Sequence, residues 1–214
     1  MSNYAIIDLE MCQIPKFNAK INLRTEIIQI GATLLNSEYE VVDLFDTFVK
    51  PEYGYVNDYI YELTGISNDD LKDAPYVTEA VNKFFEWLPQ DTIMVSWSDS
   101  DKYQIRKELE IKGIAIDGID NYLKNWIDCQ KIFSNKLKEK RSYSLCEALY
   151  MSGIKSEGGE HNGFDDAYNT ASLFKKLQLE PDYKLIPIYE TLKSDKQERL
   201  SYTLGDLMEG LCLN

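Results

Sequence analysis

Short apolar runs near the start of the chain predict three strands. Residues 4–9 form an Ile-rich run bounded by polar residues, which is typical of a buried strand. Residues 26–35 and 41–49 form two further apolar runs, and the polar residues 36–38 between them favour a turn. We therefore expect these two runs to pair as an antiparallel hairpin.

The rest of the chain alternates between apolar runs and amphipathic stretches. Strands are expected at 92–97 and, as a short element, at 126–128. Apolar residues recur at helical spacing in 77–88, where Thr78 is the expected N-cap. Further helices are expected at 58–63, 100–112, 129–137, 143–151, 163–178 and 184–194, with the final twenty residues as a C-terminal helix. A hairpin followed by alternating strands and helices indicates an α/β protein with a mixed sheet.

The composition is that of a folded, acidic protein. Of the 214 residues, 44% are hydrophobic and 28% are charged, which excludes a disordered chain and favours one compact domain. The 36 Asp and Glu residues outnumber the 23 Lys and Arg residues, so the formal net charge is -13. This charge argues against a protein that coats nucleic acid by electrostatics alone, but not against a metal-loaded cleft that holds a strand end.

The sequence lacks the features of secreted and membrane proteins. The four cysteines form no CxxC pair, and no basic region precedes the first apolar run. No apolar run approaches the roughly 18 residues that are needed to cross a bilayer. We therefore expect a cytoplasmic protein with no membrane partner.

Asp8 and Glu10 are the first candidate site. Residues two apart on a strand face the same side, so their carboxylates should lie together while Ile7 and Leu9 face the other layer. Two such carboxylates repel each other unless a cation lies between them, and hard cations such as Mg²⁺ or Mn²⁺ prefer oxygen ligands. The alternative is a strand that ends at the surface in two solvated acids.

The segment from Ser96 to Asp101 is the second candidate, because it follows a predicted strand directly. Ligand sites of open α/β sheets gather at this edge, and the segment offers two acids, Asp99 and Asp101. The alternative is structural, since Ser and Asp residues here could cap the helix that follows.

His161 and Asp166 form the third candidate. His161 is the only histidine of the chain, and it lies between a glycine-rich loop and the start of a predicted helix that carries Asp165 and Asp166. An ordinary histidine pKa near 6.5 suits a general base at neutral pH. The alternative is an exposed loop histidine beside acids that favour the helix dipole.

Together, the three sites resemble the DEDDh family of 3′-to-5′ exonucleases. The first motif of that family, D-x-E, falls on Asp8 and Glu10, and the third, H-x4-D, falls on His161 and Asp166. For the second motif, the spacing to the following helix favours Asp101, and Asp99 is the alternate.

Further segments are similar to a narrower subfamily, the histone-mRNA and small-RNA-trimming exonucleases with their bacterial sporulation-inhibitor-like relatives. The similar segments read EIIQIGATLLN, DTFVKPEYG, LTGIS, DAPYVTEAV, SWSDSDKYQI and GGEHNGFDDAYNTA. The resemblance covers residues 4–178. Met11-Cys12 departs from the subfamily pattern of a small residue and Thr, and Asn162 stands where that subfamily often has Arg or Lys.

The resemblance implies a ribonuclease H-like fold with a mixed five-stranded sheet flanked by helices. It implies an exonuclease domain at 1–180, and we expect residues 181–214 to form a helical extension packed on that domain. The implied reaction removes nucleoside 5′-monophosphates from the 3′ end of single-stranded RNA or short oligonucleotides. The alternatives are a single-stranded DNA 3′-to-5′ exonuclease and a non-catalytic module that binds nucleic acid or protein.

The resemblance also assigns roles to residues. Two divalent ions, Mg²⁺ or Mn²⁺, would be held by the acids of the three motifs, and His161 would take the proton from the attacking water. Met11 and Asn162 are the candidate contacts to substrate. The implied metal ligands are Asp8, Glu10, Asp101 and Asp166.

Overall fold

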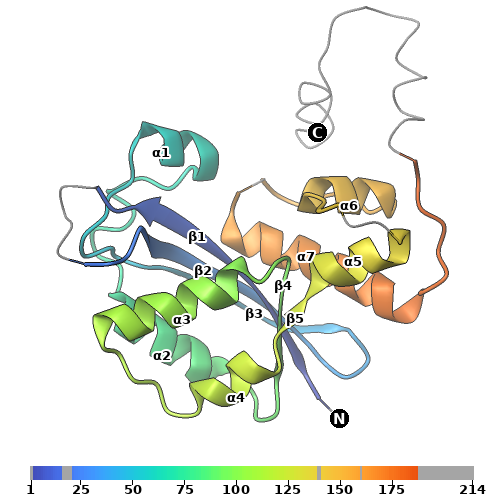
Figure 1. The fold of residues 1–214 in the computed structure, drawn as a ribbon, viewed down its shortest axis with the longest axis horizontal. Helices are drawn as coiled ribbons and strands as arrows, with labels where there is room; N and C mark the ends of the chain where they lie inside the picture. The colour runs from blue at the N-terminus through green and yellow to red at the C-terminus, as the bar shows by residue number, and fades with distance from the viewer. Residues whose placement is uncertain (1, 16–20, 139–140, 160, 188–214) are drawn as a thin grey trace, which may run out of the picture.

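A mixed five-stranded sheet forms the centre of the fold in the computed structural model, which describes residues 2–15, 21–138, 141–159 and 161–187 (Figure 1). The strand order is β3-β2-β1-β4-β5. The first three strands are antiparallel neighbours, whereas β4 and β5 run parallel to β1. The predicted hairpin and mixed sheet are thus confirmed. The strands are β1 (Tyr4–Gln13), β2 (Thr25–Leu35), β3 (Val41–Phe48), β4 (Ile93–Ser96) and β5 (Ile127–Asp128).

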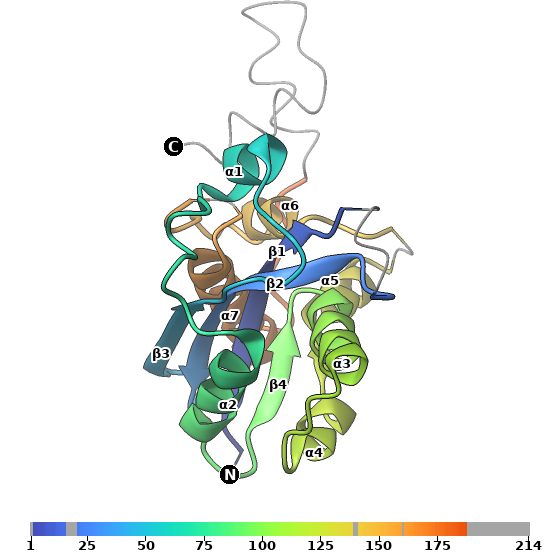
Figure 2. The same ribbon diagram turned by 90° about the vertical axis from the view of Figure 1, so that its left-hand side faces the viewer.

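Helices cover both faces of the sheet (Figures 1 and 2). One core contains buried residues of α2, α3 and α4, such as Phe84, Ile105 and Leu123. The other core contains buried residues of α5, α6 and α7, such as Phe133 and Phe174. The helices are α1 (Asp58–Thr64), α2 (Val77–Trp87), α3 (Ser100–Lys112), α4 (Ile119–Lys124), α5 (Cys129–Leu137), α6 (Leu145–Met151) and α7 (Gly163–Leu179).

The alternation of side chains along β1 decides what faces each layer. Ile7 and Leu9 lie in the core beneath α2 and α3, whereas Ile6 lies in the core beneath α7. Successive strand residues point to opposite faces, so Asp8 and Glu10 share the side of Ile6 and α7. The strand therefore presents both carboxylates to the layer that contains α7, as the sequence predicts.

Some local predictions were wrong or incomplete. Thr78 is not the N-cap of α2, because the helix already begins at Val77, and its N-cap Tyr76 makes no side-chain cap bond. The helix α4 was not predicted, because it has six residues and buries only Leu123, too little to show helical spacing. The strand β1 continues past its apolar run to Gln13, since β2 pairs with it up to Thr25.

The predicted C-terminal extension is only partly described. Residues 184–187 are not helical, and the N–H of Ile186 donates to the carbonyl of Met151 in α6 at 2.7 Å. The rest of the expected helices, residues 188–214, lies outside the described residues. Within the part of the chain that is described, no helix combines the length and the apolar character that crossing a bilayer requires.

Candidate active site

The start of α7 lies directly on the sheet because two glycines leave room for it. A Cβ atom on Gly31 of β2 would overlap the backbone of Gly163, and one on Gly163 would lie 3.1 Å from the carbonyl oxygen of Asp8. The N–H of Gly163 donates to Oε1 of Gln29 at 3.1 Å, which fixes the helix start further. This close approach brings the first turn of α7, with Asp166, to the acidic stretch of β1.

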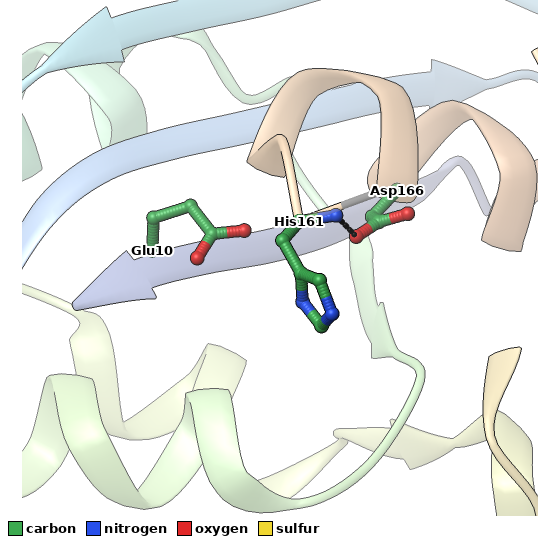
Figure 3. Close-up of side chains that lie close together, drawn as sticks. All are labelled: Glu10, His161 and Asp166. Atoms are coloured by element: carbon green, nitrogen blue, oxygen red, sulfur yellow. Dashed lines mark hydrogen bonds between the residues drawn. The ribbon is translucent and has the colours of Figure 1, made fainter. Parts of the chain in front are cut away.

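Glu10, His161 and Asp166 meet at this point (Figure 3). One ligand atom of each residue lies within 4.8 Å of those of the other two. The N–H of His161 donates to Oδ2 of Asp166 at 3.0 Å, and the carboxylate of Glu10 points toward both residues. Glu10 is buried and His161 is exposed, so the histidine ring stands at the solvent side of the cluster.

The four predicted carboxylates influence one another strongly. Burial, followed by the charges of Asp101, Asp166 and Glu10, raises the pKa of Asp8 well above its usual value. Burial, followed by the charges of Asp166 and Asp101, raises the pKa of Glu10 to about 8. The four acids are therefore close enough for their charges to act on Asp8 and Glu10, although only Glu10 and Asp166 share the close cluster with His161, and this repulsion favours a bound cation. An all-carboxylate set of oxygen ligands fits hard divalent ions such as Mg²⁺ or Mn²⁺.

Asp101, and not Asp99, faces the other acids. Asp101 is 4% exposed, and its Oδ1 accepts the N–H of Leu9 at 3.2 Å, between Asp8 and Glu10 in β1. Burial raises the pKa of Asp101 to about 7, against hydrogen bonds that lower it. Asp99, by contrast, forms an ion pair with Lys131 at the surface. Asp101 therefore lies against the part of β1 that carries Asp8 and Glu10, and its role as the ligand of the second motif stays a prediction.

The two predicted substrate contacts have structural positions. Asn162 is the N-cap of α7, and its Oδ1 accepts the N–H groups of Phe164 and Asp165. Met11 is half-buried and follows Glu10 at a register shift between β1 and β2. Both residues adjoin the acidic cluster, and their contact with substrate stays a prediction.

Gln29 is a part of the site that the sequence analysis missed. It is 1% exposed, and its amide bridges two elements: Nε2 donates to Asp46 of β3 at 2.8 Å, and Oε1 accepts the N–H of Gly163. The available signal was a polar residue in the middle of an otherwise apolar strand, because a buried amide must find partners. Gly31, two residues later, carried the signal of a close backbone approach.

Comparison with known proteins matches this chain to one family and to several of its members. The model of the exonuclease family of the RNase T type matches residues 5–174. The DNA polymerase III PolC-type of Caldanaerobacter subterraneus subsp. tengcongensis is 27% identical over 156 residues, which cover 73% of this chain and 10% of that protein. The ERI1 exoribonuclease 2 of Xenopus laevis is 29% identical over 184 residues, covering 71% of this chain and 25% of that protein. The chain thus spans a quarter or less of the length of these two relatives.

A solved structure shows the same fold. The nuclease domain of 3′hExo, described as a DEDDh family member bound to rAMP, superposes with a TM-score of 0.72 at 24% identity. The superposition covers 87% of this chain and 96% of that domain. The predicted mixed five-stranded sheet flanked by helices is thereby confirmed, and the family match over residues 5–174 confirms the resemblance to exonucleases.

Proposed function

The chain belongs to the exonuclease family of the RNase T type, and we propose that it is a metal-dependent 3′-to-5′ exonuclease acting on single-stranded RNA or short oligonucleotides. The observation that carries this proposal is the convergence of three motifs, distant in sequence, on one cluster. One ligand atom each of Glu10, His161 and Asp166 lies within 4.8 Å of the other two, and the charges of Asp101 and Asp166 act on Asp8 and Glu10. If the acids only favoured the starts of separate helices, they would not need to lie close together.

The acids would act as metal ligands. Asp8, Glu10, Asp101 and Asp166 offer carboxylate oxygens from β1, α3 and α7. Burial raises the pKa of the first three, so their ionisation is costly without a counter-charge. These acids would hold two divalent ions, whose chemistry when bound would be to activate a water and stabilise the oxygen that leaves. The choice between Mg²⁺ and Mn²⁺ is part of the experiment below.

His161 would act as the general base. Its exposed ring stands beside Glu10 and Asp166, where an imidazole nitrogen can take the proton of the attacking water. The water oxygen would then bond to phosphorus, the bond to the 3′ oxygen would break, and that oxygen would take up a proton from solvent. The products are a nucleoside 5′-monophosphate and a chain shortened by one residue that ends in a 3′-hydroxyl.

The preference for RNA is supported by the relatives named exoribonucleases. The PolC-type relative favours the alternative, a single-stranded DNA exonuclease. A non-catalytic binding module is the third reading, and the complete set of four acids and a histidine argues against it.

Short substrates fit the charge of the surface better than long ones. The net charge is -13, and two residues of the basic run, Lys136 and Arg141, have partners within the protein. Lys136 lies over the ring of Tyr183, and Arg141 pairs with Glu147. We therefore propose that the site grips a 3′ end rather than a long backbone.

The test is degradation of 5′-labelled single-stranded RNA and of its DNA counterpart with Mg²⁺ or Mn²⁺, beside the His161→Ala variant. We expect a ladder that shortens from the 3′ end, disappears with EDTA and is far slower in the variant, with a residual rate that can still be measured. The ratio of RNA to DNA rates then names the substrate. Folded wild-type protein that produces no ladder with either metal would overturn the exonuclease and leave the binding module.

A further inference from the structure

We propose that Asp165, a residue with no assigned role, is a positioning residue that holds the loop carrying His161 over the acidic cluster. This inference rests on the proposed function, because it concerns the residue that would act as base. Asp165 lies in the first turn of α7 and is half-buried, next to Asp166 but distinct from it in what it contacts.

Alternate N–H groups of the loop before α7 are accepted by side chains of that helix. The N–H of Glu157 donates to Oδ1 of Asn169 at 2.9 Å, and the N–H of Gly159 donates to Oδ2 of Asp165 at 2.9 Å. The N–H of His161 donates to Oδ2 of Asp166 at 3.0 Å. The helix therefore holds the loop at regular intervals that end at the histidine.

The loop is shaped to lie against Asp165. Gly158 has a φ of +70°, and a Cβ atom there would overlap the carboxylate of Asp165. His161 also has a positive φ, 57°, which is uncommon for a residue with a side chain. Glycine adopts a positive φ readily, whereas the conformation of His161 costs free energy that its surroundings must offset.

Asp165 fixes the loop at Gly159, two residues before His161. Asp166 anchors the histidine itself but would also be a metal ligand, so its replacement cannot separate the two roles. Asn169 is 1% exposed, so its replacement would disturb the core. Of these three residues, only Asp165 makes a loop contact that a substitution can remove while the metal ligands and the core stay unchanged.

The test is a double-mutant cycle between Asp165→Ala and His161→Ala, measured on the same labelled oligonucleotide at saturating metal. We expect Asp165→Ala to lower kcat by about 10- to 100-fold, because a misplaced base loses most of its contribution. In the His161→Ala background the same change should cost almost nothing, since there is no base left to position. Asp165→Asn, which keeps an acceptor oxygen, should restore most of the rate.

Asp120→Ala is the control, because it also removes an acid from the first turn of a helix but lies outside the site. Asp120 is exposed and lies in the first turn of α4, so this variant should keep the wild-type rate. An equal loss from Asp165→Ala with and without His161 would overturn the proposal, because the residue would then act through the metal site or the fold. No loss in either background would overturn it as well.

A second readout does not depend on activity. The chain has one histidine, so the imidazole Hε1 resonance in a proton NMR spectrum reports on His161 alone. We expect Asp165→Ala to move this resonance toward that of a free histidine peptide, and Asp165→Asn and Asp120→Ala to leave it in place. If the resonance did not move in Asp165→Ala, Asp165 would not position the loop that carries His161. This outcome can be read even if the protein shows no exonuclease activity.

Discussion

Oδ1 of Asp101 accepts the backbone N–H of Leu9 at 3.2 Å, so α3 is tied to β1 between Asp8 and Glu10. The strand β4 pairs with β1 only as far as Ile6, which leaves this part of β1 without a strand partner on that side. The Asp101 carboxylate takes the place of that partner and is at the same time brought to the other acids.

This arrangement predicts different outcomes for the two acids of the second motif. Asp101→Asn should lower exonuclease activity by more than about 100-fold, beyond the loss usual for residues that only support a metal ligand. Asp99→Asn removes one exposed ion pair with Lys131 and should change the rate only slightly. Both rates can be measured on the labelled oligonucleotide, and the reverse ranking would make Asp99 the ligand.

The raised pKa values predict how metal binding depends on pH. Burial and neighbouring acids raise the pKa of Glu10 to about 8, and burial raises that of Asp101 to about 7. Since the unfolded values lie near 4, the metal-free folded protein binds more protons than the unfolded chain above that pH. Stability of the metal-free protein should therefore fall as pH rises from about 4 to about 8.

Bound Mg²⁺ should remove this loss, because it pairs with the ionised carboxylates. We expect the rise in melting temperature on adding Mg²⁺ to be small near pH 6 and larger near pH 8.5, since metal must compete with protons for the same oxygens. Thermal unfolding with Mg²⁺ and with EDTA across this range measures the effect, and Glu10→Gln should flatten it. A metal-induced shift of equal size at both pH values would contradict this linkage.

The sequence predicted the sheet and the acids because both depend on local patterns. The run from Tyr4 to Leu9 shows which residues are buried, and strand alternation then places Asp8 and Glu10 on one side. The order of the acidic motifs was sufficient to identify the family. The position of Asp166 beside Glu10 rests on a contact between Gly31 and Gly163. A glycine within a strand signals a close approach, but it does not show which distant segment approaches.

The polar residues that support the site could not be assigned from sequence for a similar reason. Gln29, Asp165 and Asn169 act through hydrogen bonds to backbone groups of distant or looped segments. A sequence shows that a residue is polar and not which N–H group it accepts. The helix α4 was missed because one buried Leu123 gives no periodicity.

The contact between the two glycines can be tested directly. Gly31→Ala places a methyl group against the backbone of Gly163, which cannot move away as a flexible side chain could. We expect a loss of stability at or above the roughly 1–3 kcal/mol that overpacking usually costs, with a weaker site because α7 shifts. Gly159→Ala meets no atom within 4 Å and serves as the control in urea unfolding. Equal stabilities of the two variants would show that the sheet yields at Gly31.

A buried ion cluster attaches the other end of α3 to the sheet. Nζ of Lys112 lies 2.7 Å from Glu26 and 3.0 Å from Glu108, and its side chain is 4% exposed. Glu108 also accepts the N–H of Ile27 at 3.0 Å, so the cluster joins the helix to β2. Lys112 is thus the counter-charge for two carboxylates that have no access to water.

Lys112→Met should destabilise the fold by about 3–5 kcal/mol, because the buried carboxylates then lack a cation. The free energy of unfolding in urea measures this loss. Lys83→Met removes an exposed pair with Glu79 and should cost less than about 1 kcal/mol. Adding Glu108→Gln to Lys112→Met should recover part of the stability, since it removes one unpaired charge. If the double variant were as unstable as Lys112→Met, the loss would come from packing of the lysine stem and not from its charge.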